Sequence, residues 1–331
     1  MSSLKDVYEK KEVLITGGLG FLGTNLAHRL VDLGAKITLT DAVLPQYGAN
    51  QFNLDGIRDK VEINVNDIRD KSAMNQLVRD KDFIFHFAGQ VAHNDSLEDP
   101  FLDLEINCSG TLTLLEACRK YNHGAKLLFS GSRLQYGKTE RLPVEENHPL
   151  RPKSPYGVHK TAAEEYFIYY NREVGLRTTC FRITNPYGPR SQMKHSKYGI
   201  INWFIRQAMD GNTIEVFGEG KQKRDYIYVD DLVEAFLLAG IDGKTDGEVF
   251  NVGSGVPTEF KEMTESIVSI VGNGNIKYVE WPENYKNIET GDFYADISKI
   301  KSVTSWNPGI DLLDGIKRTF QFYEKNRDHY W

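Results

Sequence analysis

The sequence has few cysteines, no long apolar run and no excess of positive charge. Its three cysteines, Cys108, Cys118 and Cys180, match neither a disulfide framework nor the spacing of a metal site, so we expect small core residues in a reducing compartment. No run approaches the ~18 apolar residues of a membrane span, and residues 1–11 include no apolar signal region. We therefore expect a cytoplasmic protein without a membrane partner.

The charge balance also argues against nucleic acid as a partner. The net charge is −6, with 40 basic and 46 acidic residues, and an acidic chain gains nothing from a phosphate backbone. The length of 331 residues and the hydrophobic content of 40% suit one large α/β domain with a smaller lobe.

A glycine-spaced turn lies between a predicted strand and a predicted helix near the N-terminus. Val13–Ile15 is apolar, and Gly17, Gly20 and Gly23 follow at intervals of three. In a dinucleotide site the first glycine permits the tight turn, the second admits the pyrophosphate and the third lets helix and strand pack closely. The helix N-terminus then attracts the phosphates. A glycine-rich turn without a ligand is the alternative.

The next strand favours a dinucleotide. Residues 35–40 are strand-like and are followed by Asp41, close to the ~20-residue separation expected for the acid that binds an adenosine ribose. An aspartate there repels a 2′-phosphate, and no arginine follows directly. The sequence therefore predicts NAD and not NADP.

Short apolar strands alternate with helices through the first half of the chain. The expected strands are 61–65, 82–87, 126–129 and 178–182, and the expected helices are 71–78, 101–121 and 156–174. This alternation is typical of an α/β fold with a doubly wound parallel sheet, in which ligands bind at the carboxyl ends of the strands. The small and polar residues at 88–90 and 130–132 then fall on one rim.

The composition shifts toward glycine, proline and loops after residue 184. We expect residues 1–184 to form the dinucleotide-binding domain, with later segments returning to it, and residues 185–331 to form mainly a substrate-binding lobe. Helices are expected at 199–209, 229–239 and 259–271.

A tyrosine and a lysine with helical spacing are candidates for proton transfer. Tyr156 and Lys160 share one helix face, and Ser132 ends a strand on the predicted ligand rim. A phenol is a poor base, but a nearby ammonium and the positive nicotinamide ring favour its phenolate. Ser132 could then hold the substrate hydroxyl, and Lys160 could also bind ribose hydroxyls. An exposed Tyr–Lys pair is the alternative.

With these residues the chain resembles the extended short-chain dehydrogenase/reductase family, specifically its nucleotide-sugar epimerases and dehydratases. Segments similar to five family motifs lie in order at 16–23 (TGxxGFxG), 86–90 (HxAAQ), 107–111 (NxxGT), 130–137 (SSSxxxYG) and 156–160 (YxxxK). The resemblance covers nearly the whole chain. It implies a Rossmann-type sheet, NAD as cofactor, and Ser132, Tyr156 and Lys160 as the catalytic residues.

The resemblance also implies a fuller cofactor site. Asp67 and Ile68 would flank the adenine, and Asn107 would support the nicotinamide end. The expected NAD-binding residues are Gly17, Gly20, Phe21, Leu22, Asp41, Asp67, Ile68, Ala88, Gly89, Gln90, Asn107, Tyr156 and Lys160.

A nucleotide sugar, with UDP favoured, is the substrate that the resemblance implies. Asn185 and Arg190 lie in a segment similar to R-x-x-N-x-Y-G-P-R, and Arg224 would clamp the diphosphate unless it pairs with a neighbouring acid such as Asp225. His93 would lie near the substrate, with a surface loop as its alternative. Family members commonly form homodimers through the helices expected here near 101–121 and 156–174.

Two departures from the family pattern leave the sugar and the base open. The Asp-Glu pair of 4,6-dehydratases is absent after Ser132, where Arg133 stands instead, which argues against that reaction. Arg133 could reach an acidic sugar such as a uronate or pair with an acid such as Glu140. In the segment 289–296, Glu289 replaces a family arginine and the loop is shorter.

The sequence therefore favours an NAD-dependent nucleotide-sugar epimerase that acts at C4 of a UDP-hexose or UDP-uronate through a transient 4-keto sugar. A UDP-glucuronate decarboxylase and a sugar-nucleotide 2-epimerase or reductase are alternatives. A non-catalytic NAD-binding regulator is a further alternative, against which the intact Ser132, Tyr156 and Lys160 argue.

Overall fold

The computed structural model describes residues 3–44, 47–283 and 289–331. Its central sheet is parallel throughout, with the strand order β11-β6-β5-β4-β1-β2-β3. The strands are β1 (Glu12–Thr16), β2 (Lys36–Asp41), β3 (Val61–Val65), β4 (Phe83–His86), β5 (Lys126–Ser132), β6 (Arg177–Ile183) and β11 (Val249–Val252). This order reverses between β1 and β4, so the predicted doubly wound sheet is confirmed. The sequence analysis did not identify β11.

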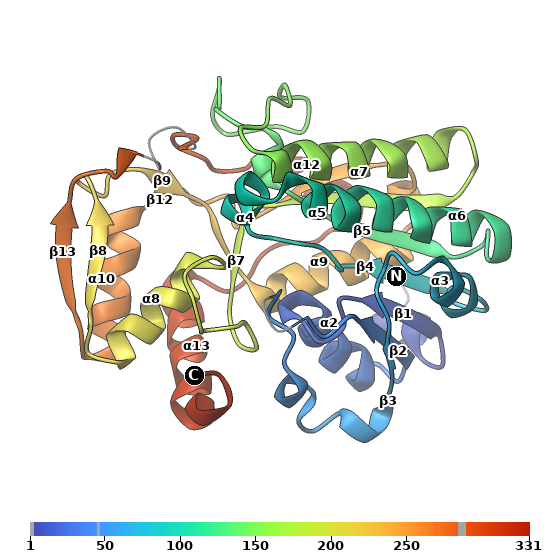
Figure 1. The fold of residues 1–331 in the computed structure, drawn as a ribbon, viewed down its shortest axis with the longest axis horizontal. Helices are drawn as coiled ribbons and strands as arrows, with labels where there is room; N and C mark the ends of the chain where they lie inside the picture. The colour runs from blue at the N-terminus through green and yellow to red at the C-terminus, as the bar shows by residue number, and fades with distance from the viewer. Residues whose placement is uncertain (1–2, 45–46, 284–288) are drawn as a thin grey trace.

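Helices cover both faces of the sheet (Figure 1). On one face lie α2 (Phe21–Asp32) and α9 (Val229–Ile241), and on the other lie α3 (Lys71–Leu77), α6 (Thr111–Tyr121) and α7 (Pro155–Arg172). The inner strands β1 and β4 are buried on both faces and are mainly apolar, whereas the edge strand β3 is partly exposed. Within β1, Ile15 packs in the α2 and α9 core, whereas Leu14 packs in the α6 and α7 core.

The expected single helix over 101–121 is divided in the structure. It consists of α5 (Pro100–Leu104), a π-helical segment at Glu105–Gly110 and α6. The wider turns carry Asn107, whose Nδ2 donates to the Gln90 carbonyl at 3.0 Å. Such segments often lie at functional sites. Apolar periodicity alone does not distinguish a wide turn from an ordinary one, so the sequence predicted a continuous helix.

A second lobe lies to the left in Figure 1. It contains α8 (Ile200–Met209), α10 (Phe260–Val271), α13 (Leu312–Asn326) and the parallel pair β8 (Thr213–Phe217) and β13 (Asn275–Val279). These elements share a separate apolar core, in which Ile205, Met263 and Tyr323 are fully buried. The sequence analysis did not predict α13, β8 or β13.

The two lobes are interleaved along the chain. Both α9 and β11 follow residue 184 in sequence, yet they belong to the first lobe, where β11 pairs with β6. The remaining elements are α1 (Leu4–Tyr8), α4 (His93–Glu98), β7 (Asn185–Tyr187), β9 (Lys223–Arg224), β10 (Tyr226–Tyr228), β12 (Thr258–Glu259), α12 (Ser298–Thr304) and several 3-10 turns. The exact boundary of the two domains stays a prediction.

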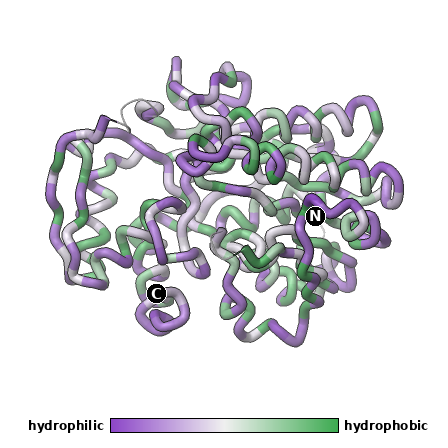
Figure 2. Tube along the Cα trace, viewed as in Figure 1, coloured by the Kyte–Doolittle hydropathy of each residue, from purple (hydrophilic) through white to green (hydrophobic). Residues whose placement is uncertain are grey.

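Hydropathy follows this architecture. In Figure 2 the loop above α7, residues 137–152, is mainly hydrophilic.

Cys108, Cys118 and Cys180 are buried free thiols, which confirms the expectation of core residues without disulfides. Across the described ranges, no helix combines the length and the apolarity that crossing a membrane requires.

The glycine turn gives a direct test of the packing at the start of α2. A Cβ atom on Gly23 would lie 2.3 Å from the Gly17 carbonyl oxygen, so the turn must shift to admit it. We expect Gly23→Ala to destabilise the protein by ~1–3 kcal/mol and to weaken NAD binding. Thermal unfolding and an NAD titration measure both effects.

Gly124→Ala is the matched control, because no heavy atom lies within 4 Å of a Cβ built there. Its stability should change by less than about 0.5 kcal/mol. Equal stability and NAD affinity in the two variants would contradict the assigned role of Gly23.

Candidate active site

One large cleft of about 1200 Å³ runs along the carboxyl ends of β1, β4 and β5 and extends to the second lobe. A typical site for one drug-sized ligand measures ~300–1000 Å³. The cleft therefore has space for more than one ligand, as a reaction between a cofactor and a substrate requires.

The phosphate-binding end of the cleft is formed by the glycine turn and α2. Gly17 has a φ of +70°, and a Cβ on it would lie 2.8 Å from the Ala88 backbone nitrogen. Gly20 caps α2 without a side chain, and the first turn holds no acid. The N–H groups of that turn are therefore open to an anionic ligand.

Asp41 lines the same cleft at the end of β2. One carboxylate oxygen accepts a hydrogen bond from Leu19 N at 3.0 Å and the other from Val43 N at 2.9 Å. Burial raises the pKa of this carboxyl group. The two backbone bonds orient the carboxylate and leave lone pairs for a ligand hydroxyl.

Buried acceptors without a partner lie beside Gly89. The side-chain oxygens of Asn107 and Gln90 are buried and make no hydrogen bond in the described structure. A Cβ on Gly89 would lie 2.7 Å from the Asn107 oxygen. Gly89 and Ala88 line the cleft, whereas Asn107 and Gln90 lie behind that wall.

The other expected cofactor residues, Phe21, Leu22, Asp67 and Ile68, also line the cleft. Asp67 is held by Arg69, whose Nε and Nη2 donate to it at 3.0 and 2.8 Å. These hydrogen bonds lower the pKa of Asp67. Together with the open helix N-terminus and Asp41, this lining fits the NAD expected from the sequence.

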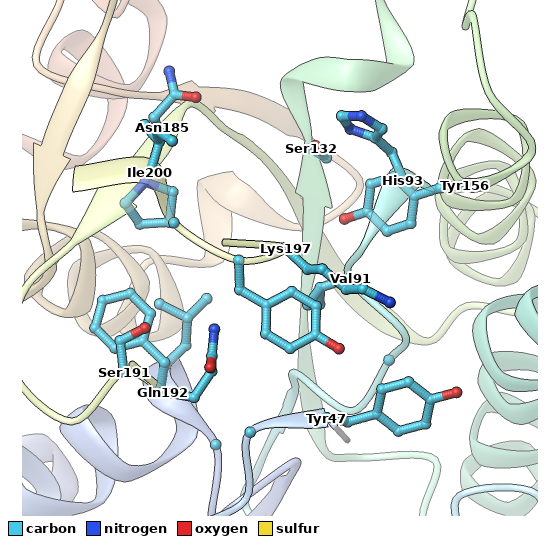
Figure 3. A pocket seen from close by; sticks show the side chains of 18 of the residues that line it. Tyr47, Val91, His93, Ser132, Tyr156, Asn185, Ser191, Gln192, Lys197 and Ile200 are labelled. Atoms are coloured by element: carbon cyan, nitrogen blue, oxygen red, sulfur yellow. The ribbon is translucent and has the colours of Figure 1, made fainter. Parts of the chain in front are cut away.

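Ser132 and Tyr156 lie close together in the cleft, at the end of β5 and the start of α7 (Figure 3). Lys160 follows Tyr156 by one turn of α7 and lines the same cleft. Lys160 Nζ donates to the Ser130 carbonyl at 2.9 Å and lies 4.8 Å from the centre of the Phe129 ring. The Ser132 side chain lies near the Tyr156 phenol and lowers its pKa. The backbone N–H of Tyr156 donates to Ser96 Oγ at 3.0 Å, which fixes the first turn of α7.

Burial sets the protonation of both groups. It raises the pKa of Tyr156, a shift that the nearby Ser132 partly offsets, and it lowers the pKa of Lys160 to about 8. Burial therefore favours the protonated phenol in the ligand-free protein, and the positive nicotinamide ring of NAD would add to the charge of Lys160 in favouring the phenolate.

His93 begins α4 and lies beside Tyr156 and Ser132 in Figure 3. Its Nε2 is buried without a partner. Burial and the charge of Arg133 lower the pKa of the imidazole, so it is neutral near pH 7. His93 therefore belongs to the cleft and not to a surface loop.

Arg133 is directed toward the second lobe. Its Nε donates to Asn185 Oδ1 at 3.1 Å, and its Nη1 donates to Thr290 Oγ1 at 3.3 Å. It does not pair with Glu140, which accepts from Arg151 instead. Burial and the nearby Arg224 lower the pKa of the Arg133 guanidinium to about 10.

Arg224 lines the cleft, and its salt bridge is with Glu289, at 2.6 Å, and not with Asp225. Asp225 is fully buried and accepts from the backbone N–H groups of Ser254, Gly255 and Ala295. Those bonds hold the segment that carries Arg224.

Arg190 lies between the two lobes. Its Nη1 donates to Asn25 Oδ1 at 2.9 Å, and its guanidinium lies 5.5 Å from the centre of the Phe322 ring. It is not part of the cleft lining in the described structure, and its expected contact with the substrate stays a prediction. Proximity in sequence to Asn185 suggested the substrate role.

Tyr226 is a cleft residue that sequence reasoning missed. It lines the cleft, is 5% exposed, and its hydroxyl is buried without a partner. It pairs with Asn185 in the register of β10 with β7. Tyr226 lies two residues after Arg224, in the same segment that indicated a substrate role for Arg224. The sequence therefore held a signal for Tyr226 as well.

Comparison with known proteins agrees with the NAD-type cleft described above. The model of the NAD-dependent epimerase/dehydratase family matches residues 13–253. A UDP-glucose 4-epimerase from Mycolicibacterium smegmatis is 32% identical over 94% of this chain and 97% of its own length. A UDP-N-acetyl-alpha-D-glucosaminuronate decarboxylase from Bacillus cytotoxicus is 31% identical over 96% of this chain and 98% of its own. The structure of Thermotoga maritima UDP-glucose 4-epimerase with UDP-glucose has a TM-score of 0.87 and 30% identity, and the match covers 96% of this chain and 99% of that one.

The buried Lys160 predicts a pH-dependent stability. Its pKa lies near 8 in the folded protein against 10.5 in the unfolded chain. Between these values the folded state binds fewer protons than the unfolded state, so stability rises with pH across that window. Below pH 8 Lys160 is charged in both the folded and the unfolded protein, so the folded protein carries the full desolvation cost of the buried ammonium.

Lys160→Met should therefore raise the stability of the ligand-free protein at neutral pH by ~1–3 kcal/mol, after allowance for the lost bond to Ser130. Chemical denaturation at a series of pH values measures the effect. The gain should shrink as the pH rises from about 8 to 10.5. A variant less stable than the wild type throughout would contradict this account.

Proposed function

The chain belongs to the NAD-dependent epimerase/dehydratase family, and from this premise we propose that it is a nucleotide-sugar epimerase that inverts C4 of a UDP-hexose or UDP-uronate. The observation that carries the proposal is the convergence of Ser132, Tyr156 and Lys160 beside an NAD-type cleft.

NAD, when bound, supplies the reversible removal of a hydride from a sugar carbon. Ser132 holds the hydroxyl of that carbon by a hydrogen bond, and Tyr156 takes the hydroxyl proton. Lys160 is 3% exposed, and its positive charge favours the phenolate of Tyr156. The large cleft leaves the resulting 4-keto sugar room to turn, so that its other face would meet the bound cofactor, and Tyr156 would then give the proton back.

A UDP-glucuronate decarboxylase is the second candidate. The Bacillus cytotoxicus relative carries a decarboxylase name, and Arg133 directly follows Ser132 in the cleft. The same oxidation of a uronate gives a β-keto acid that loses carbon dioxide. The two reactions share every step up to the keto sugar, so product mass separates them.

The substrate is found by incubating the purified protein, without added cofactor, with UDP-, GDP-, CDP- and dTDP-sugars that include UDP-glucuronate. Chromatography with mass detection should show a new product of unchanged mass. Loss of carbon dioxide would mean the decarboxylase, and loss of water would mean a dehydratase. No product from any sugar would count against an epimerase.

Tyr156→Phe tests the assigned mechanism. It removes the group that carries the proton and leaves the ring in place, so turnover should fall by at least ~10²–10⁴-fold while NAD binding and the melting temperature stay close to the wild type. Tyr278→Phe, on the exposed face of β13, is the matched control. Near-normal activity in Tyr156→Phe would rule out Tyr156 as the proton carrier.

We further propose a homodimer through α5, α6 and α7. Large apolar side chains on α5 and α7 are exposed, among them Phe101, Leu104, Val158 and Tyr169, and Phe101 is 77% exposed. These helices lie side by side in Figure 1. Burying such a surface against a second copy removes apolar area from water.

Phe101→Asp should shift the protein toward the monomer by placing a charge in this interface. Light scattering after gel filtration measures the mass across a concentration series. Leu313→Asp, at a 57% exposed position on α13, controls for a new surface charge. A dimer of unchanged strength in Phe101→Asp would place the interface elsewhere.

A cytoplasmic location is also proposed. It rests on Cys108, Cys118 and Cys180, which are buried as unpaired thiols on separate elements and suit a reducing compartment.

A further inference from the structure

Arg133 is a cation without a carboxylate partner inside the cleft. Both of its hydrogen bonds go to neutral groups, Asn185 and Thr290. In the described part of the chain, no carboxylate lies within ion-pair distance of it, and its Nη2 makes no hydrogen bond. Arg133 is partly buried, and a guanidinium without a counter-charge in such a position costs free energy unless a ligand supplies the anion.

The second arginine of this region differs in this respect. Arg224 is neutralised by Glu289 at 2.6 Å and also donates to the carbonyls of Lys223 and Gly291. Asp225 is occupied by backbone N–H groups. The described acids nearest to the two arginines are thus already bonded, and Arg133 is the cation left with positive charge to offer.

Two neutral groups near Arg133 also lack partners. The Tyr226 hydroxyl and His93 Nε2 are both buried, unbonded and part of residues that line the cleft. The charge of Arg133 acts on both side chains. Each can donate one hydrogen bond, so the three residues together present donors and no acidic group.

Arg133 and His93 lie near the residues that are expected to contact the reacting carbon of the sugar. Arg133 directly follows Ser132, which lies close to Tyr156 in the cleft (Figure 3). His93 lies beside Ser132 and Tyr156 in Figure 3. A ligand that contacts Ser132 and Tyr156 with its reacting carbon therefore places a neighbouring substituent near Arg133.

From this arrangement we propose that the cleft is built for a nucleotide sugar with a carboxylate on the hexose, which pairs with Arg133 while Tyr226 and His93 donate to it. This inference rests on the proposed nucleotide-sugar substrate. It names the acidic subset of such sugars and makes Arg133 the residue that selects them. A carboxylate suits the planar guanidinium, which can bind it through two parallel hydrogen bonds.

The test measures binding, so that it stays independent of turnover. NAD-loaded wild-type protein, Arg133→Gln and Arg151→Gln are titrated with UDP, UDP-glucose and UDP-glucuronate by calorimetry. Arg151 is an exposed arginine paired with Glu140 outside the cleft lining, so its variant controls for loss of a positive charge. Thermal unfolding of each variant confirms that the fold is retained.

The wild type should bind UDP-glucuronate more tightly than UDP-glucose. Arg133→Gln should weaken UDP-glucuronate by about ten- to hundredfold and leave UDP and UDP-glucose within about threefold. Arg151→Gln should leave all three affinities unchanged.

Equal weakening of all three ligands in Arg133→Gln would overturn the proposal, because Arg133 would then bind the diphosphate. A wild-type preference for UDP-glucose would overturn it as well. Turnover of a neutral sugar without any preference for the acid would leave the epimerase proposal intact and refute only this inference. Selective binding of the acid without turnover of any sugar would refute the epimerase and not the carboxylate site.

Discussion

The hydrogen bond from the buried Lys160 ammonium to the Ser130 carbonyl is the contact on which the site depends. It joins α7 to the end of β5 and sets Tyr156, one turn earlier on the same helix, against Ser132. The ammonium is buried without a carboxylate bonded to it in the described residues. Burying the ammonium costs the fold free energy, but it places near Tyr156 the positive charge that a tyrosine base needs.

Other polar groups of the cleft also lack partners within the protein, so a ligand can bind them. The first turn of α2 has no side-chain cap, and Asn107 and Gln90 hold buried oxygens without partners. On the substrate side the Tyr226 hydroxyl, His93 Nε2 and the Arg133 charge are likewise unmatched. Other buried polar groups of the described chain are paired, as in the Arg182–Glu164 bridge, although one oxygen of Asp103 is not. Unmatched groups therefore concentrate where ligands are expected.

The sequence predicted those elements whose structure is set by residues only a few positions apart. β1, α2 and the start of α7 carry their turn residues and apolar spacing within a few positions. The partners of Arg133 and Arg224 could not be predicted this way, because Thr290 and Glu289 come from a distant segment. Asn107 was assigned correctly to a helix, but the π-helical geometry around it depends on tertiary contacts such as its bond to Gln90. The contacts of Arg190 with Asn25 and Phe322 could not be predicted either, because these partners are distant in sequence.

The central claim is that one sugar carbon is oxidised and reduced again within a single binding event. The most direct test uses a nucleotide sugar that the protein converts, labelled with deuterium at C4, in ordinary water without added cofactor. The account predicts that the C4 epimer keeps its deuterium at C4, because the hydride returns to the carbon it left. Loss of the label to solvent, or its absence from C4 of the product, would contradict the account.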